Sequence, residues 1–179
     1  MTDDDVRGFA DERRRLLVEL DRERNQFIRN VETCRIRDIE RPFLGDWTLK
    51  DIVAHVASWD AAVVSAFRGL REGKHPTILD MDEGEVDDWN ADHVERSRNL
   101  NFWSVLEQLH GGRERLMEEI ALLDDEETGA EGTIHHRLLR AVIDHDRIHW
   151  HEIAAKLAGM AGARADTPAS IPADAAATS

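Results

Sequence analysis

The 179-residue chain is 41% hydrophobic and 34% charged and has only four prolines, a balance typical of long amphipathic helices in a single domain. Its 37 acidic side chains outnumber its 23 basic ones and give a formal net charge of −14. Such a charge repels a phosphate backbone, which argues against nucleic acid as a partner.

The cysteine content and the hydropathy restrict the compartment. Cys34 is the only cysteine, so an internal disulfide and a cysteine-based zinc site are both excluded. The acidic residues 1–5 are not followed by the apolar region of a signal peptide. No run reaches the ~18 apolar residues that a membrane span needs. We therefore expect a soluble, cytoplasmic protein without a membrane partner.

The first predicted helix covers residues 3–33, because apolar residues recur there at intervals of three and four. Thr2 is a candidate N-cap, and the acidic residues after it suit the positive end of the helix dipole. The charged residues from Arg13 to Arg24 are expected to form a solvated face with no chemical role.

The second predicted helix follows a connecting loop at residues 41–46 and extends to about residue 71. Thr48 with Asp51 resembles a capping box at its start, although glutamate or glutamine is the usual third-position residue. The polar residues 73–84 then predict a long connection to the next helix. The residues expected to be buried in this helix are Ile52, Val56, Trp59, Val63, Ala66 and Phe67.

Two more long helices are predicted beyond this connection. A helical segment from Val86 is interrupted near Asn101, and the third long helix then continues to Leu123. Its two adjacent glycines, Gly111 and Gly112, predict a bend there or just before Asn101.

The last long helix is expected to begin after Thr133 and to end near Gly159, with Ile148 among its inward residues. The fold class is therefore all-α, an up-down four-helix bundle over residues 1–160 with a long connection between helices two and three. Residues 161–179, rich in alanine and proline, are expected to be a disordered tail.

The last helix carries two histidines with the spacing of a metal site. His145 and His149 are four residues apart, so they lie on one face of the helix, about 40° apart on a helical wheel. Both fall within the inward arc defined by Leu138, Val142 and Ile153. Unpaired buried imidazoles are costly, and binding a divalent ion such as Zn, Ni, Fe or Mn would remove that cost.

His55 is the natural third ligand, because it lies at the inner edge of the second helix near its N-terminal end. Three protein histidines with positions left open for water are typical of catalytic rather than structural metal sites. The alternative is that these histidines are surface or hydrogen-bonded residues. A shift of one residue in the register would make His151, expected to face solvent, the ligand instead.

A family resemblance supports this interpretation. The segment from Gly45 to His55, together with the later His145 and His149, resembles the DinB superfamily of bacterial four-helix proteins, including its ClbS/DfsB-type and maleylpyruvate-isomerase-like branches. The similarity covers about residues 6–158. It implies a metal triad formed by His55, His145 and His149, and a homodimer.

The resemblance also bears on activity and on the pocket. It implies a thiol-dependent S-transferase using mycothiol, bacillithiol or glutathione, or a hydrolase of reactive small molecules, in a stress or detoxification role. The segment around Trp89 and Asn90 resembles the Trp-Asn segment of ClbS/DfsB-like members. Trp59, Trp89, Asn90 and His93 are candidate pocket residues, although aromatic residues at helical spacing are usually part of the core.

The sequence also contains carboxylates beside the histidine pair and several histidines outside it. Asp144 and Asp146 are candidates to orient the histidines, or are simply solvated. The remaining histidines are expected at the surface: His75, His110, His135 and His136. Two other functions remain open, a non-catalytic bundle that sequesters a small molecule and a structural bundle that dimerises.

Overall fold

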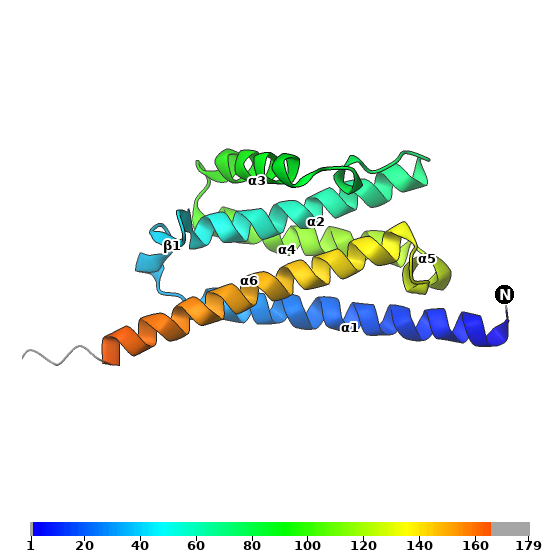
Figure 1. The fold of residues 1–179 in the computed structure, drawn as a ribbon, viewed down its shortest axis with the longest axis horizontal. Helices are drawn as coiled ribbons and strands as arrows, with labels where there is room; N and C mark the ends of the chain where they lie inside the picture. The colour runs from blue at the N-terminus through cyan, green and yellow to red at the C-terminus, as the bar shows by residue number, and fades with distance from the viewer. Residues whose placement is uncertain (1, 166–179) are drawn as a thin grey trace, which may run out of the picture.

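Four long helices dominate the computed structural model, which describes residues 2–165 (Figure 1). Their bounds are α1 (Asp3–Thr33), α2 (Leu49–Arg71), α4 (Phe102–Ala121) and α6 (Ile134–Ala165). The prediction of an all-α helical bundle is confirmed. The bend predicted near Gly111 and Gly112, or just before Asn101, is a break in the helix before Asn101. The helix α4 continues through both glycines.

Local sequence fixes where the helices begin. Thr2 caps α1 together with Asp5, and Thr48 caps α2 as predicted. The Asp51 amide donates to the Thr48 hydroxyl over 3.1 Å, and the Asp51 carboxylate accepts from the Thr48 amide over 2.9 Å. Aspartate therefore completes this capping box in place of the usual glutamate, and it fixes the start of the helix that carries His55.

The four long helices form two parallel pairs. At one end Lys50 of α2 donates to the carbonyl of Leu100, just before α4, and at the other end Arg68 of α2 pairs with Glu119 of α4. Similarly, Glu12 near the start of α1 contacts His136 near the start of α6. The bundle therefore does not alternate strictly up and down as predicted, because the connection between α2 and α4 is long enough to return the chain to its starting end.

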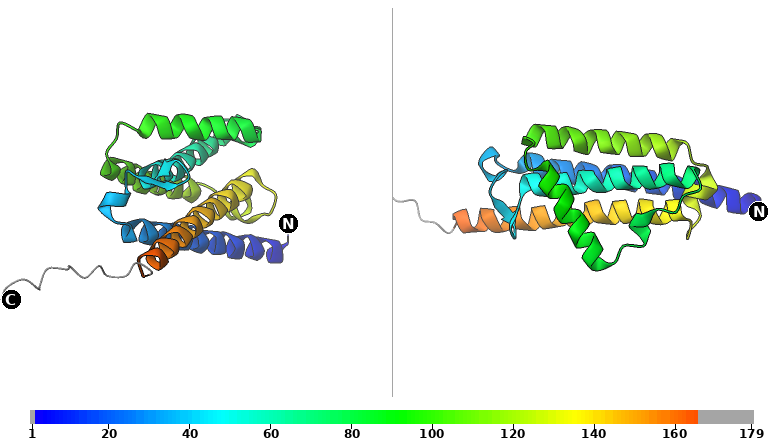
Figure 2. Two further views of the ribbon diagram at one scale, coloured as in Figure 1. Left: turned by 60° about the vertical axis from the view of Figure 1, so that its left-hand side comes forward. Right: turned by 90° about the horizontal axis from the view of Figure 1, so that it is seen from above.

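That connection contains η2 (Thr77–Leu79) and α3 (Glu83–Ser97), which lies outside the bundle next to α2 (Figure 2). Between α1 and α2 the chain forms η1 (Ile36–Asp38) and an antiparallel hairpin of β1 (Pro42–Leu44) and β2 (Trp47–Thr48). Gly45 turns this hairpin with a φ of +57°, a conformation that favours glycine. The predicted loop at residues 41–46 is thus largely this hairpin.

The short helix α5 (Asp125–Gly129) precedes α6 and packs against α1. The last helix extends to Ala165, past the end predicted near Gly159, so the first residues of the predicted tail are helical. The rest of that tail, residues 166–179, lies outside the described residues.

The hydrophobic core consists of two clusters, one toward each end of the bundle. One contains Leu20, Phe67 and Leu116, and the other contains Phe27, Ile52 and Leu109. Each long helix contributes residues to both clusters, and between them in its sequence it carries one charged residue of a buried network. These four charged residues are here called the polar layer. The polar layer consists of Arg24, Asp60, Arg113 and Asp146.

Several predicted exposures were wrong. Glu23 and Arg24, expected on a solvated face, are only 3% and 4% exposed, because both pair with charged groups of α6. Ile148, expected to face inward, is 55% exposed, since the inward positions of this turn are taken by His145 and His149.

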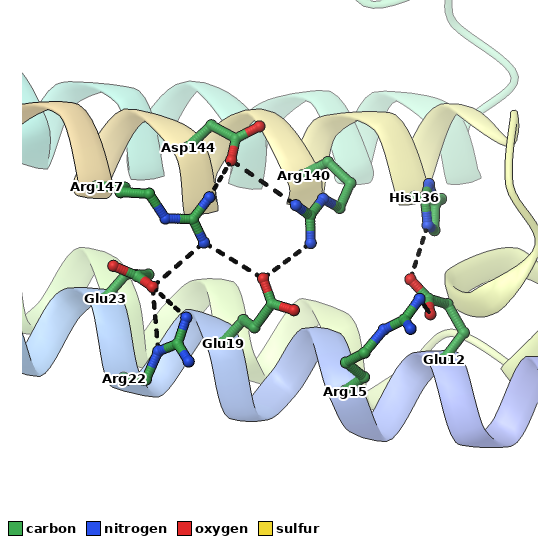
Figure 3. A network of polar contacts seen from close by, with 9 residues as sticks. All are labelled: Glu12, Arg15, Glu19, Arg22, Glu23, His136, Arg140, Asp144 and Arg147. Carbon is green, nitrogen blue, oxygen red and sulfur yellow. Dashed lines mark hydrogen bonds and ion pairs between the residues drawn. The ribbon is translucent and has the colours of Figure 1, made fainter.

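A ladder of ion pairs joins α1 to α6 along one side of the bundle (Figure 3). Glu19 accepts from Arg140 over 2.9 Å, and it lies 3.4 Å from Arg147. Arg147 also reaches Glu23 and Asp144. This ladder connects only the first and last helices, whereas the polar layer connects all four. Within residues 2–165, none of the helices has the length and apolar character needed to cross a membrane.

Candidate metal centre

Three histidines from two helices converge inside the bundle. His55 follows the capped start of α2 by about two turns, and α6 contributes His145 and His149. The Nε2 atoms of His145 and His55 are 2.8 Å apart, and those of His149 and His145 are 3.1 Å apart. The structure therefore brings together the three residues that the sequence singled out.

The arrangement fits a single metal ion. All three ligand atoms lie within 4.8 Å of one another, and no other such group of histidine, cysteine or carboxylate side chains was found in the described part of the chain. Three ligands held about 2.05 Å from a tetrahedral zinc ion are about 3.3 Å apart. The two observed Nε2 separations of 2.8 and 3.1 Å are about 0.5 and 0.2 Å shorter than this value, so small side-chain movements would admit the ion.

Two of the three rings, those of His55 and His145, are held in the neutral form that metal ligation requires. Burial, assisted by the nearby His149, lowers the pKa of His55 to about 3. Asn90 opposes this shift, although Nδ1 of His55 makes no hydrogen bond of normal geometry. Burial likewise lowers the pKa of His145 to about 2, with His149, His55 and the arginines of the polar layer acting in the same direction.

Glu152 orients the third histidine. Its carboxylate lies 2.8 Å from Nδ1 of His149 and can accept the proton on that nitrogen, which leaves Nε2 free to point at the other two rings. The His149 side chain is 14% exposed and His55 only 4%, so the cluster meets solvent on the His149 side. Glu152 was missed from the sequence, where its position three residues after His149 was the available signal.

Aromatic rings enclose the inner side of the cluster. The Trp47 ring lies edge-on to His55, with ring centroids 5.1 Å apart. Trp59 lies between the cluster and α3, with its ring centroid 5.6 Å from that of His145 and 5.0 Å from that of Trp89. These rings exclude water from His55 and favour its neutral state.

The four candidate pocket residues separate into two pairs. Trp59 donates through Nε1 to Oδ1 of Asn90 over 3.0 Å, which ties α2 to α3 beside the histidines. Trp89 and His93 stack with centroids 3.8 Å apart and line a cavity of about 480 Å³ between α2 and the connection that contains α3. His55, His145 and His149 do not line this cavity.

The other histidines differ in how far they are exposed. His151 is exposed as expected, and so are His75 and His110. His136 is buried against Glu12, so the prediction of a surface residue was wrong. His135 is partly buried, with its ring edge-on to Phe67.

Neither aspartate beside the histidines orients them. Asp144 is exposed and pairs with Arg147, while Asp146 is fully buried and accepts from Arg24 and Arg113. The structure therefore contradicts a direct role for Asp144 and Asp146 in hydrogen bonding to the ligands.

A four-helix bundle with a cluster of three histidines between α2 and α6 defines a DinB-like protein with a possible metal site. The sequence profile of the mycothiol maleylpyruvate isomerase N-terminal domain matches residues 20–161, and the chain belongs to this DinB-like family. The resemblance stated from the sequence is thus confirmed. Searches among curated proteins and among solved structures gave no match.

Proposed function

We propose that the chain binds one divalent transition metal ion through His55, His145 and His149. The close approach of three imidazole ligand atoms, two of them on histidines whose pKa values are strongly lowered, carries this proposal. Zn, Ni, Fe and Mn are the candidate ions, because neutral imidazole nitrogens are ligands for divalent transition metal ions. The ion would complete a site that the helices have already assembled.

We propose further that the site serves a thiol-dependent transferase, or a hydrolase, acting on a small reactive electrophile. The family description names mycothiol, a low-molecular-weight thiol. A bound divalent ion supplies a Lewis acid that favours the thiolate over the thiol. The residues of this chain would hold that ion, keep His55 and His145 neutral and exclude water on the Trp47 side. The role proposed for this chemistry is stress response or detoxification, as the family resemblance implies, and the proposed location is the cytoplasm.

Metal analysis of protein prepared without a histidine tag tests the site. Wild-type protein is expected to retain about one ion per chain, and His55→Ala or His145→Ala to lose it. His151→Ala is the matched control, because it removes an exposed imidazole from the same helix as two of the ligands. Equal metal content in all of these proteins would refute the proposed site.

The reaction needs its own assay. Metal-loaded protein is mixed with mycothiol, bacillithiol or glutathione and a generic electrophile such as an aryl halide, and loss of free thiol is followed. EDTA treatment and His55→Ala should abolish any acceleration, whereas His151→Ala should retain it. An acceleration that survives EDTA would show that the reaction does not use the ion.

A second candidate function is favoured by the 480 Å³ cavity beside Trp89 and His93, which is separate from the histidines. In this case the bundle sequesters a small molecule without catalysis. Ligand binding would then raise the melting temperature equally with and without EDTA, and Trp89→Ala would remove the effect.

We also propose a homodimer, for which sedimentation at high concentration should give twice the monomer mass.

A further inference from the structure

The polar layer takes one residue from each long helix. Arg24 belongs to α1, Asp60 to α2, Arg113 to α4 and Asp146 to α6. Their side chains are 5%, 1%, 12% and 1% exposed, respectively. Charged groups this deeply buried are rare unless they are paired, and here two positive and two negative charges balance.

Every carboxylate oxygen in the layer has an arginine partner. Asp60 lies 3.1 Å from Arg113 through both of its oxygens and also contacts Arg24. Asp146 accepts from Arg24 over 2.8 and 3.0 Å and from Arg113 over 2.9 Å. Burial disfavours the charge on Arg24, but Asp60 and Asp146 together outweigh this effect and raise its pKa. The layer is therefore held by directional bonds between two arginines and two aspartates.

The charged residues of the polar layer are distributed over the helices in the same way as the histidines of the metal centre. The two helices that supply the histidines also supply the two carboxylates. Asp146 directly follows His145, and Asp60 follows His55 by five residues, about 7.5 Å along the helix axis. The two helices without ligands, α1 and α4, supply the arginines that bridge those carboxylates.

Stability alone gives no reason for such a layer. A buried ion network is often no more stable than well-packed apolar side chains of similar volume, whereas it accepts far fewer arrangements of its partners. The packing around it is also specific. A Cβ at Gly112 would lie 3.4 Å from Cβ of Asp60, at van der Waals contact distance, so α4 packs directly against α2 beside Arg113.

We propose that the polar layer sets the axial register of α2 against α6 and thereby positions the histidines, with Arg24 and Arg113 as positioning residues for the metal centre. A slip of one residue along either helix is about 1.5 Å, half of the 2.8 Å between Nε2 of His55 and that of His145. Directional bonds to both carboxylates prevent such a slip. This inference rests on the proposed metal binding.

The test removes the α4 and α6 members of the layer without leaving an unpaired charge. Arg113→Met/Asp146→Leu deletes one positive and one negative group and leaves the pair between Arg24 and Asp60. Zn²⁺ affinity is measured by competition with a chromophoric chelator, well below the melting temperature of each protein. The expected result is a loss of affinity of about tenfold or more, the usual effect of losing groups that orient ligands.

The ladder of Figure 3 provides the matched control. Arg140→Met/Glu19→Leu removes an equally charge-balanced pair between α1 and α6, but one that does not reach α2. This control is expected to change Zn²⁺ affinity less than twofold. The absorption spectrum of bound Co²⁺ gives a second readout, expected to change in the polar-layer variant and to stay unchanged in the ladder variant.

If the double variant does not fold, the Zn²⁺ affinity of Arg113→Lys tests the same inference. This variant keeps the charge but cannot form the fork of bonds that spans both carboxylates, so a severalfold loss of affinity is expected. Wild-type affinity and an unchanged Co²⁺ spectrum in a folded polar-layer variant would overturn the inference. If the wild type itself binds no metal through the histidines, the proposed function fails first, which is a different result.

Discussion

Mild acid should destabilise the metal-free protein through its buried histidines. The pKa of His55 is lowered to about 3 and that of His145 to about 2, against an ordinary value of 6.5. Between these values the unfolded chain binds protons that the folded chain does not. Their contribution to stability is therefore complete above pH 6.5 and is lost as the pH falls toward 3.

The size of the effect between pH 7 and pH 5 depends little on the exact folded-state values. Both folded-state pKa values lie far below pH 5, so the loss is set by protonation of the unfolded chain. It amounts to about 2 kcal/mol for each histidine and about 4 kcal/mol for the pair. This is a large part of the ~5–15 kcal/mol by which a typical domain is stable.

Urea unfolding in EDTA, at pH 7 and at pH 5, measures this loss. His55→Gln should lose about 2 kcal/mol less than wild type between the two pH values, because one of the two groups is gone. His151→Gln, which removes an exposed histidine, should behave as wild type. Carboxylates that also titrate are common to all three proteins and cancel in the comparison. Equal losses in wild type and His55→Gln would show that His55 is not held neutral by burial.

Three other predictions follow from single contacts. Gly129→Ala should destabilise the protein by about 2 kcal/mol or more in urea unfolding, because a Cβ there would lie 2.7 Å from the carbonyl carbon of Phe9. Glu152→Gln should weaken Zn²⁺ binding about tenfold in a chelator competition, since it removes the carboxylate that orients His149. Thr48→Ala should lower the melting temperature through the loss of about 1 kcal/mol of helix capping.

The first two of these have a matched control. Gly8→Ala adds a methyl group to α1 where no other atom lies within 4 Å, so stability should stay the same or rise slightly. Glu118→Gln neutralises an exposed glutamate on α4 and should leave Zn²⁺ affinity unchanged. A Gly129→Ala protein as stable as Gly8→Ala would contradict the close approach of α5 to α1, and equal affinities in the two glutamate variants would contradict the role of Glu152.

The helix spacing was sufficient to predict the long helices and the cluster of three histidines. His145 and His149 share an inward face by periodicity alone, and His55 lies at the edge of another apolar stripe, so their convergence needed only the pairing of α2 with α6. The direction of α4 was not predictable in this way, because residues 73–101 can return the chain to either end of the bundle. The contacts of Lys50 with Leu100 and of Arg68 with Glu119 show which end it reached.

The polar layer was missed although the sequence carries its signal. Arg113 lies four residues after Leu109 and three before Leu116, an inward position between buried leucines. Asp60 and Arg24 stand at equivalent places in their own helices. In a chain with 34% charged residues, a charge on an inward stripe is easily assigned to the solvated face. The partner that makes its burial possible lies on another helix, and helical periodicity says nothing about that partner.

The division of the hydrophobic core by the polar layer affects how the bundle opens. One apolar cluster, with Phe67 and Leu139, lies toward the α5 end, and the other, with Phe27 and Ile153, lies toward the hairpin. Because each cluster packs mainly within itself, the two ends are the natural units of partial unfolding, which hydrogen exchange resolves as separate foldons. His55 and His149 belong to the hairpin end. An ion held there would slow exchange at that end directly and would leave the α5 end to exchange at a rate set by its own packing.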